Sequence, residues 1–131
     1  MIVSQLTLKN WRNFRNADVK FAERVFVIGP NASGKSNLLD VFRFLRDIAM
    51  PGGGLQQAVT LRGGLSKIRC LAARKEPDVE ISVELSEPGS ASTWTYSIGI
   101  TQQVRGFRQP ILRYEKVWKG NTHIFGKTKC G

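Results

Sequence analysis

Residues 29–36, Gly-Pro-Asn-Ala-Ser-Gly-Lys-Ser, combine glycine, lysine and serine at a spacing suited to phosphate chemistry. They fit the phosphate-binding loop pattern G-x-x-x-x-G-K-[ST]. Gly29 and Gly34 allow backbone conformations closed to side chains, so successive amide N–H groups can surround a phosphate. In this pattern Lys35 contacts the β- and γ-phosphates as the catalytic residue, and the Ser36 hydroxyl ligates magnesium. The pattern therefore predicts a nucleoside triphosphate site with magnesium. Its residues are Gly29, Pro30, Asn31, Ala32, Ser33, Gly34, Lys35 and Ser36.

The flanks of this segment suit a loop between a strand and a helix. Residues 25–28 are an unbroken apolar run, as in a parallel strand covered on both faces. Residues 36–49 show a helical period, and Pro51 with the glycines at 52–54 ends it. Polar residues recur at Ser36, Asp40, Arg43 and Asp47, and apolar residues occupy Leu38, Val41, Phe42, Leu45, Ile48 and Ala49. The start of this helix directs its positive dipole end at the anion.

The composition is that of one globular domain. The chain has 131 residues, of which 41% are hydrophobic. No stretch reaches the roughly 18 apolar residues of a membrane span, and the start lacks a secretory signal, so we expect a cytoplasmic protein without a membrane partner. Cys70, Cys130 and the lone His123 have no second metal ligand at a suitable spacing, which argues against zinc.

The net charge of +10 favours polyanionic partners. The densest basic cluster could contact nucleic acid or be a solvated sheet face, and it comprises Arg105, Arg108, Arg113, Lys116 and Lys119. Trp94, Tyr96 and Trp118 could stack on bases, but their alternation with polar residues favours a core face.

Alternating patterns predict further strands. Two lie near residues 6–8 and 17–21, separated by a turn over residues 10–16. After a glycine-containing connection with a short helix near residues 55–61, period-two strands follow at residues 79–85, 94–100 and 112–118, and a turn then leads back to residues 124–125. We therefore divide the chain into the N-terminal strands, loop and helix (1–50), the connection (51–75), an antiparallel β-subdomain (76–125) and a tail (126–131).

Residues 6–14 together with residues 27–37 resemble the start of ABC-type ATPases of the SMC and RecF kind, and within that group the OLD-like and related AAA ATPases. Trp11 stands in place of the usual phenylalanine and Asn13 in place of serine. The resemblance implies an α/β fold with an incomplete P-loop NTPase (ABC-ATPase-like) core and an antiparallel β-subdomain after the P-loop helix. It also implies that Arg12 and Asn13 contact the base or phosphates, whereas the alternative is that Arg12 and Arg15 are merely solvated turn residues. Asn31 would lie by the γ-phosphate, and Asn37 would anchor the helix start.

The same resemblance implies ATP as the ligand, a complete form that hydrolyses ATP in DNA repair, maintenance or defence, and a homodimer or multimer that acts on DNA. Such sites need an apolar strand ending in Asp-Glu and a Leu-Ser-Gly-Gly-Gln signature, and the sequence offers neither. Residues 61–65 are only superficially similar to that signature. Gln102, Gln103 and Gln109 are equivalent candidates for a glutamine near magnesium. We therefore expect the N-terminal part of an ATPase, inactive alone, poorly soluble or self-associating.

Two other functions are compatible with the sequence. A small-molecule kinase also uses a phosphate-binding loop, but helices and an arginine-bearing lid usually follow the loop there, whereas period-two strands follow it here. A non-catalytic nucleic-acid-binding module fits the charge and the missing acids.

Overall fold

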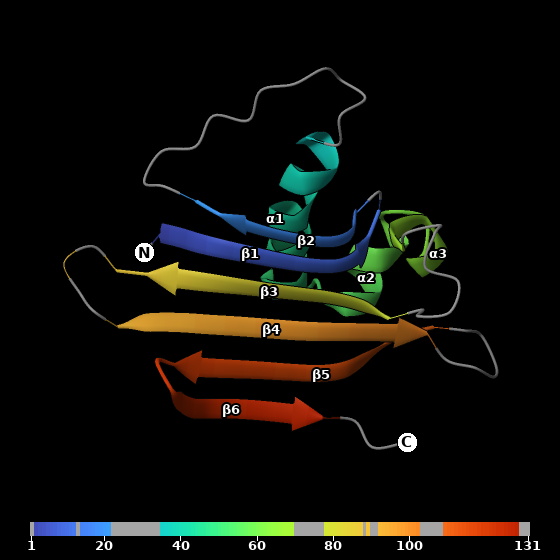
Figure 1. Ribbon diagram of the computed structural model, residues 1–131. Helices are drawn as coiled ribbons and strands as arrows, with labels where there is room; N and C mark the ends of the chain where they lie inside the picture. The colour runs from blue at the N-terminus through green and yellow to red at the C-terminus, as the bar shows by residue number, and fades with distance from the viewer. Residues whose placement is uncertain are drawn as a thin grey trace.

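The computed structural model describes residues 2–12, 14–21, 35–69, 78–87, 89, 92–102 and 109–128. This part of the chain forms a six-stranded sheet in the order β2-β1-β3-β4-β5-β6, with every neighbouring pair antiparallel. Three helices lie on one face of the sheet (Figure 1). The strands are β1 (Ile2–Trp11), β2 (Phe14–Lys20), β3 (Val79–Ser86), β4 (Thr93–Gln102), β5 (Pro110–Lys119) and β6 (Thr122–Thr128). The helices are α1 (Lys35–Ala49), α2 (Leu55–Thr60) and α3 (Leu65–Ile68).

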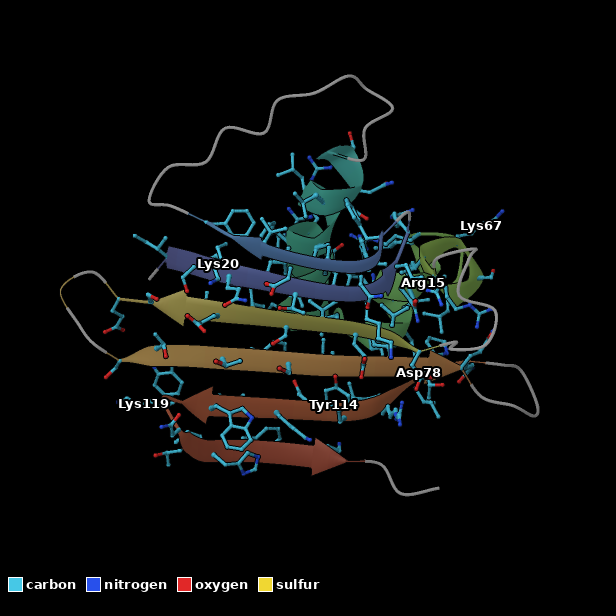
Figure 2. The ribbon with its side chains drawn as sticks, in the orientation of Figure 1. Arg15, Lys20, Lys67, Asp78, Tyr114 and Lys119 are labelled. Atoms are coloured by element: carbon cyan, nitrogen blue, oxygen red, sulfur yellow. The ribbon has the colours of Figure 1, made fainter. Side chains whose placement is uncertain are left out.

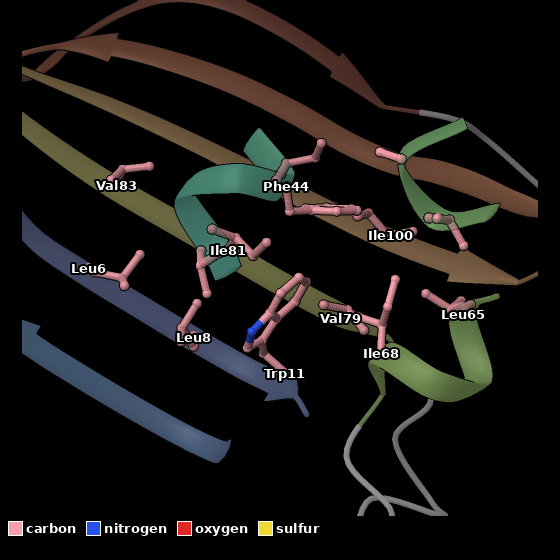
Figure 3. Close-up of a cluster of buried hydrophobic side chains, with 14 residues drawn as sticks. Leu6, Leu8, Trp11, Phe44, Leu65, Ile68, Val79, Ile81, Val83 and Ile100 are labelled. Atoms are coloured by element: carbon pink, nitrogen blue, oxygen red, sulfur yellow. The ribbon is translucent and has the colours of Figure 1, made fainter. Parts of the chain in front are cut away.

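Strand β1 is central to the core. Leu6 pairs with Val19 on β2 and with Val83 on β3, so their side chains share the helix-covered face. Leu6 and Phe44 of α1 are both fully buried, and both belong to one cluster that all three helices and the three strands β1, β3 and β4 supply (Figure 3). Its buried members are Leu6, Leu8, Trp11, Val41, Phe44, Ala58, Val59, Leu65, Ile68, Val79, Ile81, Val83, Ile98 and Ile100.

The predicted first two strands are confirmed, but the turn between them is much shorter than residues 10–16. Trp11 pairs with Phe14, which leaves only two residues between the strands. Asn10 is the first residue of the expected turn, and asparagine is common in turns. Its side chain instead donates a hydrogen bond to the carbonyl oxygen of Asp78 at 2.8 Å, and the residue is buried. This long-range bond keeps Asn10 in β1 despite a φ of 59°.

The predicted helices at residues 36–49 and 55–61 are confirmed as α1 and α2. Helix α3 was missed because four residues are too few to show a helical period. The predicted strand at residues 25–28 lies outside the described residues. The four later strands are confirmed, and β3 pairs with β1, so they extend the sheet begun by β1 and β2.

A bulge corrects one prediction about the sheet faces. Gly99 pairs with Tyr114 and Ile100 pairs with Leu112, which leaves Arg113 as an extra residue in β5. Leu112 therefore lies on the helix-covered face, whereas Tyr114 and the residues two and four positions later lie on the opposite face. Trp94 and Tyr96 are on the helix-covered face as expected. Trp118 is not, because the alternating pattern alone does not reveal the bulge.

Within the described residues, no helix is long and apolar enough to cross a membrane.

Candidate nucleotide-binding site

Helix α1 begins inside the predicted phosphate-binding loop. Its first residue is Lys35, and Ser36 follows it, exposed in the first turn. The two residues expected at the phosphates and at magnesium are thus at a helix N-terminus, where the dipole favours an anion. The side chain of Lys35 lies outside the described part of the chain. So do the other predicted contacts Gly29, Pro30, Asn31, Ala32, Ser33, Gly34 and Asn13, whose roles stay predictions.

Trp11 fixes the end of β1 to this first turn. Its indole Nε1 donates a hydrogen bond to the carbonyl oxygen of Asn37 at 2.8 Å. The Trp11 ring is fully buried, with its centroid 5.1 Å from that of Phe44. The contact satisfies the buried indole N–H and ties the turn after β1 to α1.

Arg12 follows Trp11 and turns toward the same helix. Its φ is 50°, and its backbone N–H donates to the carbonyl oxygen of Ile68 at the end of α3. Its Nη2 lies 2.9 Å from Oδ2 of Asp40, and its side chain is only 24% exposed. Its Nε is buried and has no hydrogen-bond partner among the residues that the structure describes. Arg12 is therefore an ion-paired residue against α1 with donor capacity to spare, not a freely solvated turn residue.

Arg62, in the connection between α2 and α3, is the most enclosed charge near α1. Its side chain is 9% exposed. Its Nε and Nη2 donate to the two carboxylate oxygens of Asp40 at 3.0 and 3.1 Å. Its Nη1 donates to Asp47 at 3.0 Å and to the carbonyl oxygen of Ala58 at 2.9 Å. The guanidinium carbon lies 5.1 Å from the ring centroid of Phe44, within cation–π range.

The two aspartates respond to these arginines. Partial burial alone would raise the pKa of Asp40, but hydrogen bonds and charges from Arg62 and Arg12 outweigh burial and hold the pKa below its usual value. A hydrogen bond from Arg62, helped by Arg46, lowers the pKa of Asp47 in the same way. Both carboxylates are consequently ionised at neutral pH.

We call Arg12, Asp40, Asp47 and Arg62 the arginine clamp. It joins the β1–β2 turn, the P-loop helix α1 and the α2–α3 connection through charge-assisted hydrogen bonds. The helical period in the sequence placed Asp40 and Asp47 among the polar residues of the helix, but it did not identify Arg62 as their partner. The available signal was the pair of aspartates seven residues apart, which share one side of a helix.

The remaining sequence candidates are dispersed. Residues 61–65 form the arginine-bearing turn into α3, with Gly63 and Gly64 at positive φ values of 88° and 101°. Gln109 accepts a hydrogen bond from Gln56 at 3.2 Å, away from the clamp contacts. Across the described ranges, no three His, Cys, Asp or Glu side chains group as metal ligands.

Comparison with solved structures defines the class of protein. The fold matches a chain solved in work on the ATP-driven dimerization and DNA-stimulated activation of SMC ATPases, with a TM-score of 0.61 and 16% identity. The match covers 95% of this chain and 73% of that one. Together with the sequence motif, it indicates a P-loop NTPase fold of the SMC/RecF-like ABC type, as the sequence predicted.

Comparison with protein families gives the particular assignment. Residues 24–127 match the family described as "AAA domain, putative AbiEii toxin, Type IV TA system", and the chain belongs to this family. It is also 30% identical over 91 residues to the DNA replication and repair protein RecF of Synechocystis, and 37% identical over 59 residues to RecF of Rickettsia felis. These matches cover 68% and 44% of this chain but only 24% and 15% of the two relatives.

Proposed function

We propose that this chain binds ATP with magnesium, as the ATP-binding portion of an SMC/RecF-like ATPase. The observation that carries the proposal is that α1 begins at Lys35, within the phosphate-binding motif of residues 29–36. This motif lies inside the segment that matches the AAA family, residues 24–127. In this scheme the backbone of residues 29–34 surrounds the phosphates, Lys35 neutralises the β- and γ-phosphates, and Ser36 ligates magnesium.

Arg12 and Asn13 are further proposed nucleotide contacts. The bond from Trp11 to Asn37 and the Arg12–Asp40 pair hold the β1–β2 turn against the first two turns of α1, at the N-terminal end of this helix. The buried Nε of Arg12 is a donor suited to a phosphate oxygen. Its pairing with Asp40 supports this role, because an arginine held beside the helix loses less side-chain entropy on binding.

The complete form is proposed to hydrolyse ATP as a dimer or multimer that acts on DNA in repair, maintenance or defence. The RecF relatives and the SMC ATPase neighbour support this class of activity. This chain supplies the ATP cradle without the Asp-Glu strand end that activates water, so alone it binds ATP without turning it over.

Calorimetry with magnesium and ATP on the folded chain tests the proposal. Lys35→Ala should abolish the heat of binding, and Ser36→Ala should weaken binding only when magnesium is present. Lys67→Ala is the matched control, because Lys67 is an exposed lysine on α3 and lies apart from α1 (Figure 2). Equal affinities of the Lys35→Ala and Lys67→Ala proteins would refute ATP binding by the loop, and a parallel titration with GTP measures base preference.

A further inference from the structure

The sheet face opposite the helices carries a row of rings and one lysine on the last hairpin. Tyr114, Lys116 and Trp118 alternate along β5, and His123 of β6 pairs with Trp118. All four side chains therefore point away from α1, α2 and α3. Figure 2 shows Tyr114 on β5, one strand away from the sheet edge formed by β6. We call these four residues the aromatic face.

The rings of the aromatic face lie across the backbone of the sheet. A Cβ atom at Gly99 would be 2.4 Å from Cε1 of Tyr114, so this glycine makes room for the ring on the neighbouring strand. The Tyr114 hydroxyl donates to a carboxylate oxygen of Glu80 on β3 at 3.1 Å, which fixes the direction of the ring across β4. Two strands thus hold the ring in place before any ligand arrives.

The second pair of rings is arranged in a similar way. His123 and Trp118 meet edge to face with centroids 4.7 Å apart. A Cβ atom at Gly126 would be 2.5 Å from Nε2 of His123, so a glycine again lies under a ring. A glycine lies under the Tyr114 ring and another under the His123 ring, and the Trp118 ring packs against His123. These contacts restrict the rotation of the rings, so the rings lose little side-chain entropy when a ligand binds.

The hairpin that carries the aromatic face is basic. Residues 109–128 contain four basic side chains, Arg113, Lys116, Lys119 and Lys127, and one acidic side chain, Glu115. Lys116 lies on the aromatic face, whereas Lys119, which pairs with Trp94, and Lys127, which pairs with Glu115, lie on the helix-covered face. The carboxylate of Glu115 accepts a hydrogen bond from the hydroxyl group of Tyr96 on the helix-covered face. The ammonium group of Lys116 lies 5.2 Å from the Tyr114 ring centroid, and within the described part of the chain it forms no ion pair with a carboxylate.

We propose that the aromatic face binds single-stranded nucleic acid. Unpaired bases would stack on Tyr114 and Trp118, and the phosphate backbone would run beside Lys116, a combination that open β-sheets use to bind single strands. A duplex hides the faces of its bases and cannot stack in this way. Thr95 and Ser97 of β4 pair with Trp118 and Lys116, so their small hydroxyl side chains lie beside the rings on the same face. This inference goes beyond ATP binding and does not depend on it.

Fluorescence anisotropy on the whole chain, in buffer without nucleotide, tests the proposal. The probes are labelled oligo-dT and oligo-U of about 20 nucleotides, longer than the ~4–16-nucleotide sites of single-strand binders, and a duplex of the same length. We expect both single strands to bind more tightly than the duplex. Equal or tighter binding of the duplex would overturn the proposal, and the dT-to-U ratio reports the sugar preference.

Variants separate stacking from charge. Tyr114→Leu and Trp118→Leu should each weaken single-strand binding about tenfold without changing its salt dependence, because each removes a stacking surface. Lys116→Gln should lower the slope of log affinity against log salt by about 0.7, the value for one lost phosphate contact on a single strand. Trp94→Leu is the control, since Trp94 lies on the helix-covered face, and it should bind normally. Unchanged binding by both leucine variants of the aromatic face would contradict the proposal.

A second measurement covers the case in which a leucine variant does not fold. In Trp94→Phe protein the remaining tryptophans are Trp118, which is partly exposed, and Trp11, which is fully buried. Oligo-dT should quench the Trp118 fluorescence, and fluorescence unchanged at saturating oligo-dT would refute stacking. Sedimentation of the same samples tests whether a second copy of the chain, instead of nucleic acid, covers the aromatic face. Dimers that the oligonucleotide does not dissociate would also refute the proposal.

Discussion

Trp11 and Asn37 are joined by a hydrogen bond from the indole Nε1 to a main-chain carbonyl oxygen, 26 positions apart in sequence. The bond places the end of β1 against the first turn of the helix that follows the phosphate-binding loop. Because the indole is fully buried, this orientation is set by both the bond and the packing on Phe44.

Replacing Trp11 tests this relationship. Trp11→Phe should lower the free energy of unfolding by about 2–4 kcal/mol, through the lost hydrogen bond and the space left by the smaller ring. Urea unfolding followed by circular dichroism measures it. Trp94→Phe, on the less covered part of the sheet, should cost less, and equal costs would contradict the role of the Trp11 bond.

Removing the guanidinium of Arg62 should destabilise the clamp. Arg62→Met leaves Asp40 with one partner and Asp47 with an exposed one, and we expect a loss of about 3 kcal/mol because the arginine is nearly enclosed. Arg46→Met is the matched control: Arg46 is 64% exposed and should change stability by about 0.5 kcal/mol or less. Thermal unfolding of the two variants measures both losses. Equal losses would mean that burial does not set the strength of the ion pairs made by Arg62 and Arg46.

The clamp should make stability depend on acid pH. The pKa values of Asp40 and Asp47 are lower in the folded protein than in the unfolded chain, so their contribution is present above the unfolded value of about 3.9 and is lost as pH falls through the folded values. The difference in melting temperature between wild type and Arg62→Met should therefore be constant from neutral pH down to about pH 5 and shrink below pH 4. A difference that persists undiminished at pH 2 would mean that packing, not charge, causes it.

The two tyrosines should titrate late. Burial, with the charge and hydrogen bond of Glu80, raises the pKa of Tyr114 to about 12. Burial and Glu115 raise the pKa of Tyr96 further. Since the chain has only these two tyrosines, absorbance of tyrosinate near 295 nm should stay absent at pH 10.5 in the folded protein and appear at about pH 10 in denaturant. The raised values mean that both residues stabilise the fold below pH 10, and Tyr114 loses this contribution as pH rises through about 12.

Gly99 should be intolerant of a side chain. Gly99→Ala must displace the Tyr114 ring, which then loses its bond to Glu80, and we expect a cost of about 1–3 kcal/mol. In Gly99→Ala protein the pKa of Tyr114 should also move back toward 10, which the absorbance titration detects. A double variant with Tyr114→Ala should cost less than the sum of the two single changes, because the second change removes the clash.

Much of the architecture could be predicted from local patterns. Period-two alternation located β3 and β4, and the spacing of Val41, Leu45 and Ile48 located α1, because burial on one face dictates these periods. The pairing of Asn10 with Asp78 and of Arg62 with Asp40 could not be predicted, since such contacts depend on how distant segments meet. The bulge at Arg113 was invisible for the same reason, and it moved Trp118 to the opposite face from the one expected.

The pairing of β1 with β3 has a consequence for the growing chain on the ribosome. Ile2 pairs with Ser86 and Lys9 with Glu80, so β1 can pair with β3 only after residues 79–86 have been synthesised. Until then β1 and β2 can form only an isolated hairpin, which is marginally stable in water. Helix α1 then lacks the apolar side chains of β3 and β4 on which it packs in the folded protein. The segment with the phosphate-binding motif is therefore synthesised before β3, and we expect the apolar side chains of β1 and α1 to stay exposed until β3 pairs with β1.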